Sequence, residues 1–113
     1  MQEPTFLILT ALAAQPLHGY AVIQSVTALS GGEVTLRPGT LYGALDRLTE
    51  QGLIAVDHEE AVEGRLRRYY RLSDTGAGVL AEQAERLHRH AAAAERQLGK
   101  RLGPSPAFRA VTA

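Results

Sequence analysis

Apolar residues recur at helical spacing near the start of the chain. Pro4 precedes an apolar run from Phe6 to Ala13, and proline is well tolerated in the first turn of a helix. The run therefore predicts a mostly buried first helix, which Gln15-Pro16 interrupts. A second stretch, from Tyr20 to Leu29, places apolar residues three and four positions apart, which predicts a second, amphipathic helix.

A third helix is predicted to begin at Pro38 and to end at Gly52, because glycine readily adopts the left-handed conformation that closes many helices. The segment before it, Val34 to Leu36, is long enough only for a short strand. Leucines at three- and four-residue spacing give the third helix one apolar stripe, so its other face is free to contact a partner. The stripe consists of Leu41, Leu45 and Leu48.

Two stretches rich in β-branched and aromatic residues follow Gly52 and predict a β-hairpin. They run from Leu53 to His58 and from Leu66 to Leu72, and the acidic, glycine-containing stretch from Glu59 to Arg65 separates them. We therefore expect a hairpin with a long exposed tip.

Ser73 or Asp74 is placed to cap a final helix that carries an apolar seam at alternating four- and three-residue spacing. The helix is expected to end at Leu98, because prolines follow Gly99 and the remaining residues show no period. The predicted organisation is a helix-and-hairpin unit over 1–73, a helix suited to dimerisation over 74–98 and a tail over 99–113. The seam consists of Leu80, Ala84, Leu87, Ala91, Ala94 and Leu98.

Composition narrows the possible functions. The 113 residues fit one domain, and 45% hydrophobic with 21% charged residues is ordinary for a folded protein. Because the chain has no cysteine, it has neither disulfides nor thiolate metal sites, which fits a cytoplasmic protein. The early apolar run is too short to cross a membrane, so no membrane partner is expected. The formal net charge is zero, so any nucleic-acid contact must come from local arrangement.

The order helix, helix, short strand, helix, hairpin, long helix matches a winged helix-turn-helix fold: mainly α with a small β-hairpin, plus a long C-terminal dimerisation helix. In such folds the third helix enters the DNA major groove and presents its N-terminal, outward-facing residues to bases and phosphates. The candidate DNA-binding residues on it are Arg37, Thr40, Tyr42, Gly43 and Arg47.

The hairpin adds an arginine cluster of the kind that contacts a phosphate backbone or a minor groove. Strand alternation places Arg67, Tyr69 and Arg71 on one face and Arg68 and Tyr70 on the other, so not every arginine can reach DNA. The alternative is that some of them pair with acidic residues of the same hairpin. The DNA-binding candidates are Arg65, Arg67 and Arg68, and the acidic candidates are Glu59, Glu60 and Glu63.

Four motifs in order give this chain a resemblance to the PadR family of transcription regulators. They are Leu17-His18-Gly19-Tyr20, the stretch from Arg37 to Leu48, Gln51-Gly52-Leu53-Ile54, and the stretch from Arg68 to Gly76. The resemblance is to the shorter subfamily with a single C-terminal helix. It implies a homodimer that reads a pseudo-palindromic promoter site and commonly represses until a small-molecule effector binds. It also marks Tyr20 and Tyr42 as phosphate contacts.

The chain departs from the family pattern at two points. Gly43 stands where the family frequently has proline, so the first turns of the third helix are less rigid. A well-known member stacks flat aromatic compounds on tryptophans at its dimer interface. This chain has no tryptophan, so that effector class is not carried over.

Two other classes of function compete with DNA binding. An enzyme or metal protein would use the four histidines, but His88 and His90 are two apart on a helix and do not face the same side. No phosphate-binding glycine loop or nucleophile motif is present, so we predict no enzymatic activity and no cofactor. The second class is a protein-interaction module, because winged domains also bind proteins.

Overall fold

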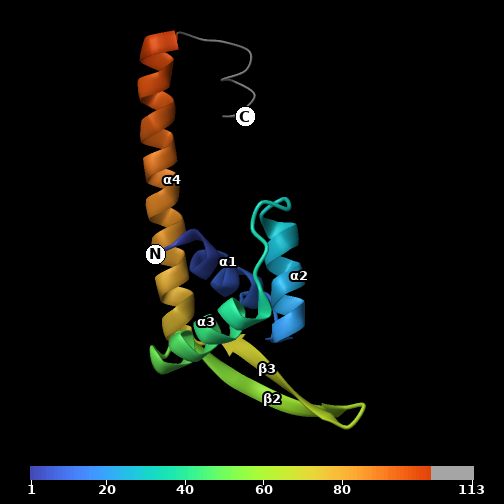
Figure 1. The fold of residues 1–113 in the computed structure, drawn as a ribbon. Helices are drawn as coiled ribbons and strands as arrows, with labels where there is room; N and C mark the ends of the chain where they lie inside the picture. Colours follow the sequence, from blue (N-terminus) through green and yellow to red (C-terminus); the bar gives the residue numbers. More distant parts are fainter. Residues whose placement is uncertain (103–113) are drawn as a thin grey trace. The chain divides into compact units, whose positions relative to one another are not determined.

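The computed structural model describes residues 1–102, which form four helices and one three-stranded antiparallel sheet (Figure 1). The chain divides into two units, Met1–Ala81 and Glu82–Ala113. The predicted mainly helical winged fold with a long C-terminal helix is confirmed. The elements are α1 Glu3–Leu12, β1 Leu17–His18, α2 Gly19–Leu29, α3 Pro38–Glu50, β2 Ile54–Val62, β3 Arg65–Leu72 and α4 Asp74–Leu102.

The core of the first unit lies where α1, α2 and α3 meet the sheet. The predicted stripe of α3 is fully buried, with Leu41 and Leu45 at 0% exposure and Leu48 at 1%. Each such side chain contributes about 1.5 to 3 kcal/mol when it leaves water. The stripe therefore fixes how α3 is rotated, and its opposite face points outward. Helices α1 and α2 add Ile8, Leu9, Leu12, Val22 and Val26, and the core also includes Leu36, Ile54 and Tyr70.

The predicted end of α3 at Gly52 is confirmed. Gly52 has a φ of 74°, and its N–H donates to the Thr49 carbonyl at 3.0 Å. The next N–H, of Leu53, donates back to the Leu48 carbonyl at 3.0 Å, which completes a Schellman closure. This closure turns the chain from the helix directly into β2.

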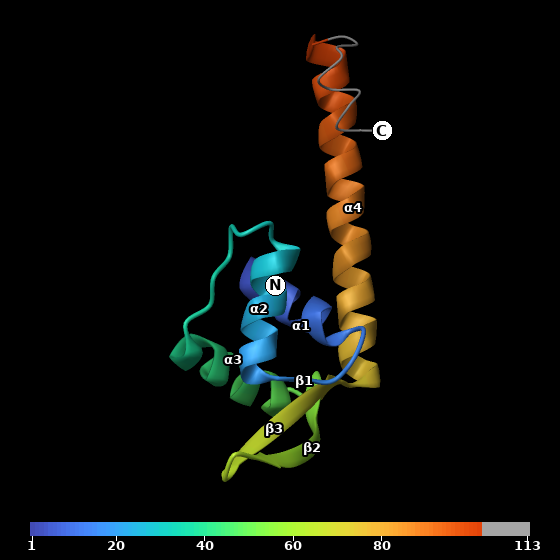
Figure 2. The ribbon, with the colours of Figure 1, turned by 90° about the vertical axis from the view of Figure 1, so that its right-hand side faces the viewer.

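The third strand of the sheet does not come from the segment predicted to form it. Val34 to Leu36 is not a strand, although Leu36 is buried. Instead Leu17 and His18 form β1, which pairs with Tyr70 and Tyr69 of β3, giving the strand order β1-β3-β2. Figure 2 shows β1 running beside β3. The pairing joins residues far apart in sequence, which no local pattern reveals.

The hairpin is longer than expected, and the predicted long tip is wrong. The strands continue until Val62 pairs with Arg65, so only Glu63 and Gly64 form the turn. Their φ values of 51° and 76° are those of a two-residue type I′ turn, which matches the natural twist of two strands. The tip projects away from the helices of the first unit (Figures 1 and 2).

Helix α4 begins where predicted but ends later. The hydroxyl of Ser73 accepts from the Gly76 N–H at 2.9 Å, which caps the first turn. The predicted end at Leu98 is wrong, because the helix continues through Gly99 to Leu102. Lys100 and Arg101 lie in the last turn, where positive charge interacts favourably with the negative end of the helix dipole. The rest of the predicted tail, 103–113, lies outside the described residues.

Candidate nucleic-acid interface

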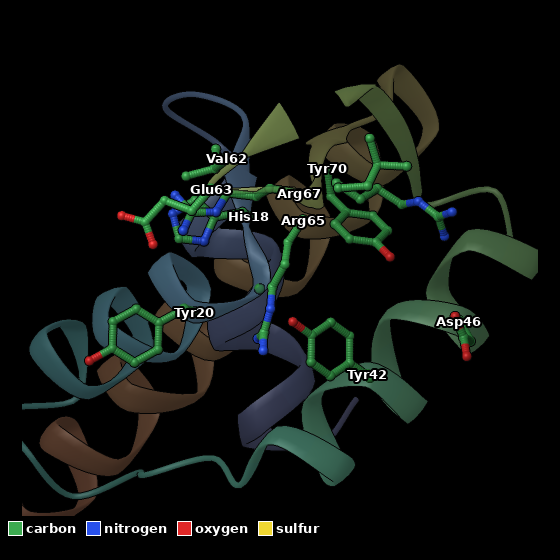
Figure 3. A pocket seen from close by; sticks show the side chains of 12 residues that line it. His18, Tyr20, Tyr42, Asp46, Val62, Glu63, Arg65, Arg67 and Tyr70 are labelled. Atoms are coloured by element: carbon green, nitrogen blue, oxygen red, sulfur yellow. The ribbon is translucent and has the colours of Figure 1, made fainter. Parts of the chain in front are cut away.

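An open cleft of about 830 Å³ lies between the first turn of α2, the outer side of α3 and the hairpin. Five predicted DNA-binding residues line it together: Tyr20, Tyr42, Arg65, Arg67 and Arg68. Figure 3 shows the Arg65 side chain reaching from the hairpin toward the two helices that carry the tyrosines. The cleft also includes His18, Asp46 and Tyr70, which were not among the predicted site residues.

Tyr42 is held by close packing against the start of α2. A Cβ atom built on Gly19 would lie 2.6 Å from the Tyr42 hydroxyl oxygen and 2.8 Å from the ring carbon that bears it. A side chain at position 19 would therefore displace the ring, which explains glycine in the His18-Gly19-Tyr20 motif. Tyr42 is still 50% exposed, and Tyr20 is 64% exposed. Tyr42 therefore combines a fixed position with access to solvent, and Tyr20 is open to solvent beside it.

The hairpin arginines divide into two groups. Arg68 contacts Glu59 at 3.5 Å and Arg71 contacts Asp57 at 3.7 Å, so part of the cluster is paired within the hairpin. In the part of the chain that the structure describes, Arg65 and Arg67 take part in no ion pair. Exposed ion pairs contribute little stability, so all of these guanidinium groups can exchange partners at low cost.

The remaining predicted residues of α3 lie outside this cleft. Three of them are exposed: Arg37 directly before the helix, and Thr40 and Gly43 on it. No hydrogen bond from the Arg37 side chain caps the first turn. Arg47 faces a separate cleft of about 500 Å³, next to Gln2 and Thr5 at the start of the chain. The structure therefore brings together the tyrosines and the hairpin arginines, and it separates Arg47 from them.

Three aromatic side chains form a row across the sheet, one from each strand. The His18 ring meets the edge of Tyr69 at 5.3 Å, and the His58 ring stacks on Tyr69 at 4.4 Å. His18 Nδ1 accepts from the Ala21 N–H at 3.3 Å and so caps α2. His58 contacts Asp57 at 2.6 Å and Glu60 at 3.2 Å. A bulge between Val56 and His58 brings His58 onto the face of Tyr69.

The pKa values of His18 and His58 are shifted in opposite directions. Partial burial, reinforced by the charge of Arg67, lowers the pKa of His18, and Glu60 only partly offsets this. For His58, the hydrogen bond to Asp57 raises the pKa, assisted by Glu60. The neutral form of His18 is also the form that can accept the helix-capping bond, since a protonated Nδ1 cannot accept.

We expect NMR titration to resolve these histidines on either side of the unfolded pKa of about 6.5. His18 stabilises the folded state above the unfolded pKa, and this stabilisation is lost as pH falls through the lowered pKa of folded His18. His58 stabilises the folded state below the unfolded pKa, and this stabilisation is lost as pH rises through the raised pKa of folded His58. Asp57→Asn should lower the pKa of His58 and leave that of His18 in place. Equal pKa changes of His18 and His58 in this variant would contradict the assignment of the His58 shift to Asp57.

The seam of α4 is open to solvent in the single chain. Leu87 and Leu98 are each 45% exposed, and the alanines of the seam are exposed as well. Leu80, at its start, instead packs partly against the core of the first unit. Among residues 1–102, no helix is long and apolar enough to span a membrane, and no cluster of acidic or histidine side chains is placed to hold a metal ion.

Comparison with known proteins assigns this fold to a family. The family model described as the transcriptional regulator PadR-like family matches residues 8–82. The chain belongs to this PadR-like family. The family consists of transcription regulators rather than enzymes. The matched residues span the three-helix core, the cleft and the first turns of α4.

PadR-like relatives and structures cover most of this chain. Transcriptional regulator Rv3488 of Mycobacterium tuberculosis is 38% identical over 80 residues, which is 71% of each protein. Transcriptional regulator YqjI of Escherichia coli is 34% identical over 85 residues, 75% of this chain but 39% of the relative. A PadR family regulator from Clostridium difficile matches with a TM-score of 0.72 at 24% identity, covering 87% of this chain and 100% of that one.

The PadR fold has also been seen with DNA. Bacillus subtilis PadR in complex with operator DNA matches this PadR-like chain with a TM-score of 0.66 at 22% identity, covering 74% of this chain and 48% of that one. Together these matches establish the PadR-like fold over the region that holds the cleft.

Proposed function

We propose that this PadR-like chain is a sequence-specific DNA-binding regulator that represses transcription as a homodimer on a pseudo-palindromic promoter site in the cytoplasm. The observation that carries this proposal is the cleft, which two exposed tyrosines and the arginines of the hairpin line together. Hydroxyls and guanidinium groups are among the side-chain donors that proteins use on phosphates. Arg65 and Arg67, which have no ion-pair partner within residues 1–102, are the first candidates for the backbone.

The N-terminal half of α3 is suited to the major groove. Its first turn has no side-chain cap, so its N–H groups are available to an anionic phosphate. Thr40, exposed in the first turns of α3, and Arg47, exposed in its last turn, are proposed as base readers. Gly43 lies on the outward side, and a Cβ built there meets no atom within 4 Å. Packing within the chain therefore does not require glycine at this position, whereas a closely approaching duplex would.

Gly43→Ala is expected to stabilise the fold while weakening DNA binding. Alanine in a helix interior is favoured over glycine by roughly 0.5 to 1 kcal/mol. The added methyl group lies where we place the duplex, so we expect an affinity loss on the order of tenfold. Thermal unfolding and fluorescence anisotropy on the same samples measure both effects. Gly78→Ala, at an exposed glycine of α4, should raise stability without weakening binding. Unchanged affinity of Gly43→Ala would contradict close approach.

Dimerisation through α4 is the second part of the proposal. Exposed leucines repeated along one helical seam are costly in water, and a second copy of the chain would cover them. The unit over 1–73 would then bind DNA, and the helix over 74–98 would pair. A small-molecule effector would relieve repression by changing how the two helices pair, and with it the separation of the two α3 helices.

A binding series in salt tests the proposed function against a protein-interaction role. The labelled probe is the intergenic DNA upstream of the gene, with random-sequence competitor in excess. About six phosphate contacts per dimer predict an affinity loss of about a thousandfold between roughly 50 and 200 mM salt, because counterions are released. No preference for the probe over competitor, with no dependence on salt, would favour the interaction module.

A further inference from the structure

Two acidic side chains, Asp46 and Glu63, line the cleft beside its cations, and Asp46 is the one on α3. Asp46 follows Tyr42 by one helical turn on α3 and lines the same cleft as Arg68. Asp46 shares this cleft with Arg65 as well (Figure 3). It is exposed. Across the described residues 1–102 it makes no ion pair and no side-chain hydrogen bond, while Arg68 is paired with Glu59 instead. Asp46 therefore neither stabilises the fold by pairing nor orients a neighbouring arginine.

A carboxylate at this place lowers affinity for the DNA backbone, because phosphates carry the same charge. What it can do in a major groove is accept a hydrogen bond. Cytosine offers an amino group there without an adjacent acceptor on the same base. Adenine offers its amino group beside the N7 acceptor, which would repel a carboxylate and is better matched by an amide. The chemistry of Asp46 thus selects cytosine.

We propose that Asp46 is a specificity-determining residue that accepts a hydrogen bond from a cytosine amino group in each half-site. The inference rests on the proposed DNA-binding function and names one base pair that it reads. Asp46 lowers the affinity for all DNA and restores it only where cytosine is present, so it increases discrimination at the expense of affinity. Tyr42, one turn earlier and fixed against Gly19, supplies the neighbouring phosphate contact that sets the register.

Selection of binding sites from a pool of randomised duplexes tests this proposal. The wild-type protein is expected to select a cytosine at one position of each half-site, with a preference of roughly 5- to 150-fold over other bases. Asp46→Ala should reduce that preference to about twofold or less and bind random-sequence DNA more tightly. Asp46→Asn should move the preference at the same position toward adenine, since an amide pairs with its amino group and N7.

Glu50→Ala is the matched control. Glu50 is an exposed acidic residue of the same helix that does not line the cleft. Its removal should tighten binding to random DNA by a similar factor and leave the selected sequence unchanged. Circular dichroism checks that each variant keeps its helices. An Asp46→Ala consensus identical to that of the wild-type protein overturns the inference and leaves the proposed function standing. A wild-type protein that selects no consensus overturns the proposed function itself.

Discussion

Leu87→Asp is expected to dissociate the dimer and to abolish specific DNA binding in the same step. Leu87 lies in the middle of the seam and is 45% exposed in the single chain, so the change removes little packing within one copy. In a paired seam, each copy would bury one unpaired carboxylate at a cost of at least about 2 kcal/mol. Two such costs raise the dimer dissociation constant on the order of a thousandfold.

Sedimentation equilibrium and anisotropy on operator DNA measure the two losses separately. Gln97→Asp is the control, because it adds the same charge at an exposed position of α4 outside the seam. It should leave both the dimer and DNA binding in place. A Leu87→Asp monomer that still binds its operator as tightly as the wild-type protein would contradict the dimer model.

Gly76→Ala and Gly78→Ala are expected to change stability in opposite directions, although the two glycines are two residues apart in α4. A Cβ on Gly76 would overlap the Leu53 carbonyl oxygen and lie 2.8 Å from a methyl carbon of Leu72. The Leu53 carbonyl already accepts from the Ser73 N–H at 3.1 Å, so the backbone there cannot easily move. Overpacking of this kind costs roughly 1 to 3 kcal/mol or more.

At position 78 the same substitution meets no atom within 4 Å, and alanine should add up to about 1 kcal/mol of helix stability. Each kcal/mol corresponds to a shift of roughly 4 to 8 °C in the midpoint of thermal unfolding for a domain of this size. Thermal unfolding at equal protein concentration should therefore give Gly76→Ala a midpoint well below that of the wild-type protein and Gly78→Ala a midpoint above it. A Gly76→Ala midpoint at or above that of the wild-type protein would show that α4 does not begin packed against Leu53.

Local patterns sufficed for the helices of the first unit. Pro4 and Pro38 lie in the first turns of α1 and α3, and Gly52 closes α3 as its position indicated. These features depend on residues close in sequence. Local pattern predicts the third strand at Val34–Leu36, and the structure has no strand there. The observed partner of β3 is Leu17–His18, a choice that depends on a pairing across some fifty residues.

The sequence predicts which residue types form the candidate site, but not which of these residues the fold brings together. Alternation along β3 correctly separated Tyr69 from the buried Tyr70. It could not show which arginines find acidic partners, because a bulge in β2 sets that register. Asp46 could have been found from its spacing, since it follows Tyr42 by four positions on a helix. A negative charge by itself disfavours contact with DNA, and only the fold places Asp46 beside the tyrosines and arginines of the cleft.

Hydroxyl-radical footprinting of the protein on a selected binding site tests the central claim most directly. Two copies that place their α3 helices in successive major grooves should protect two segments related by a dyad. The centres of these segments should lie about 34 to 36 Å apart, one turn of the duplex. A single protected segment, or protection that does not depend on sequence, would contradict a dimer that reads two half-sites.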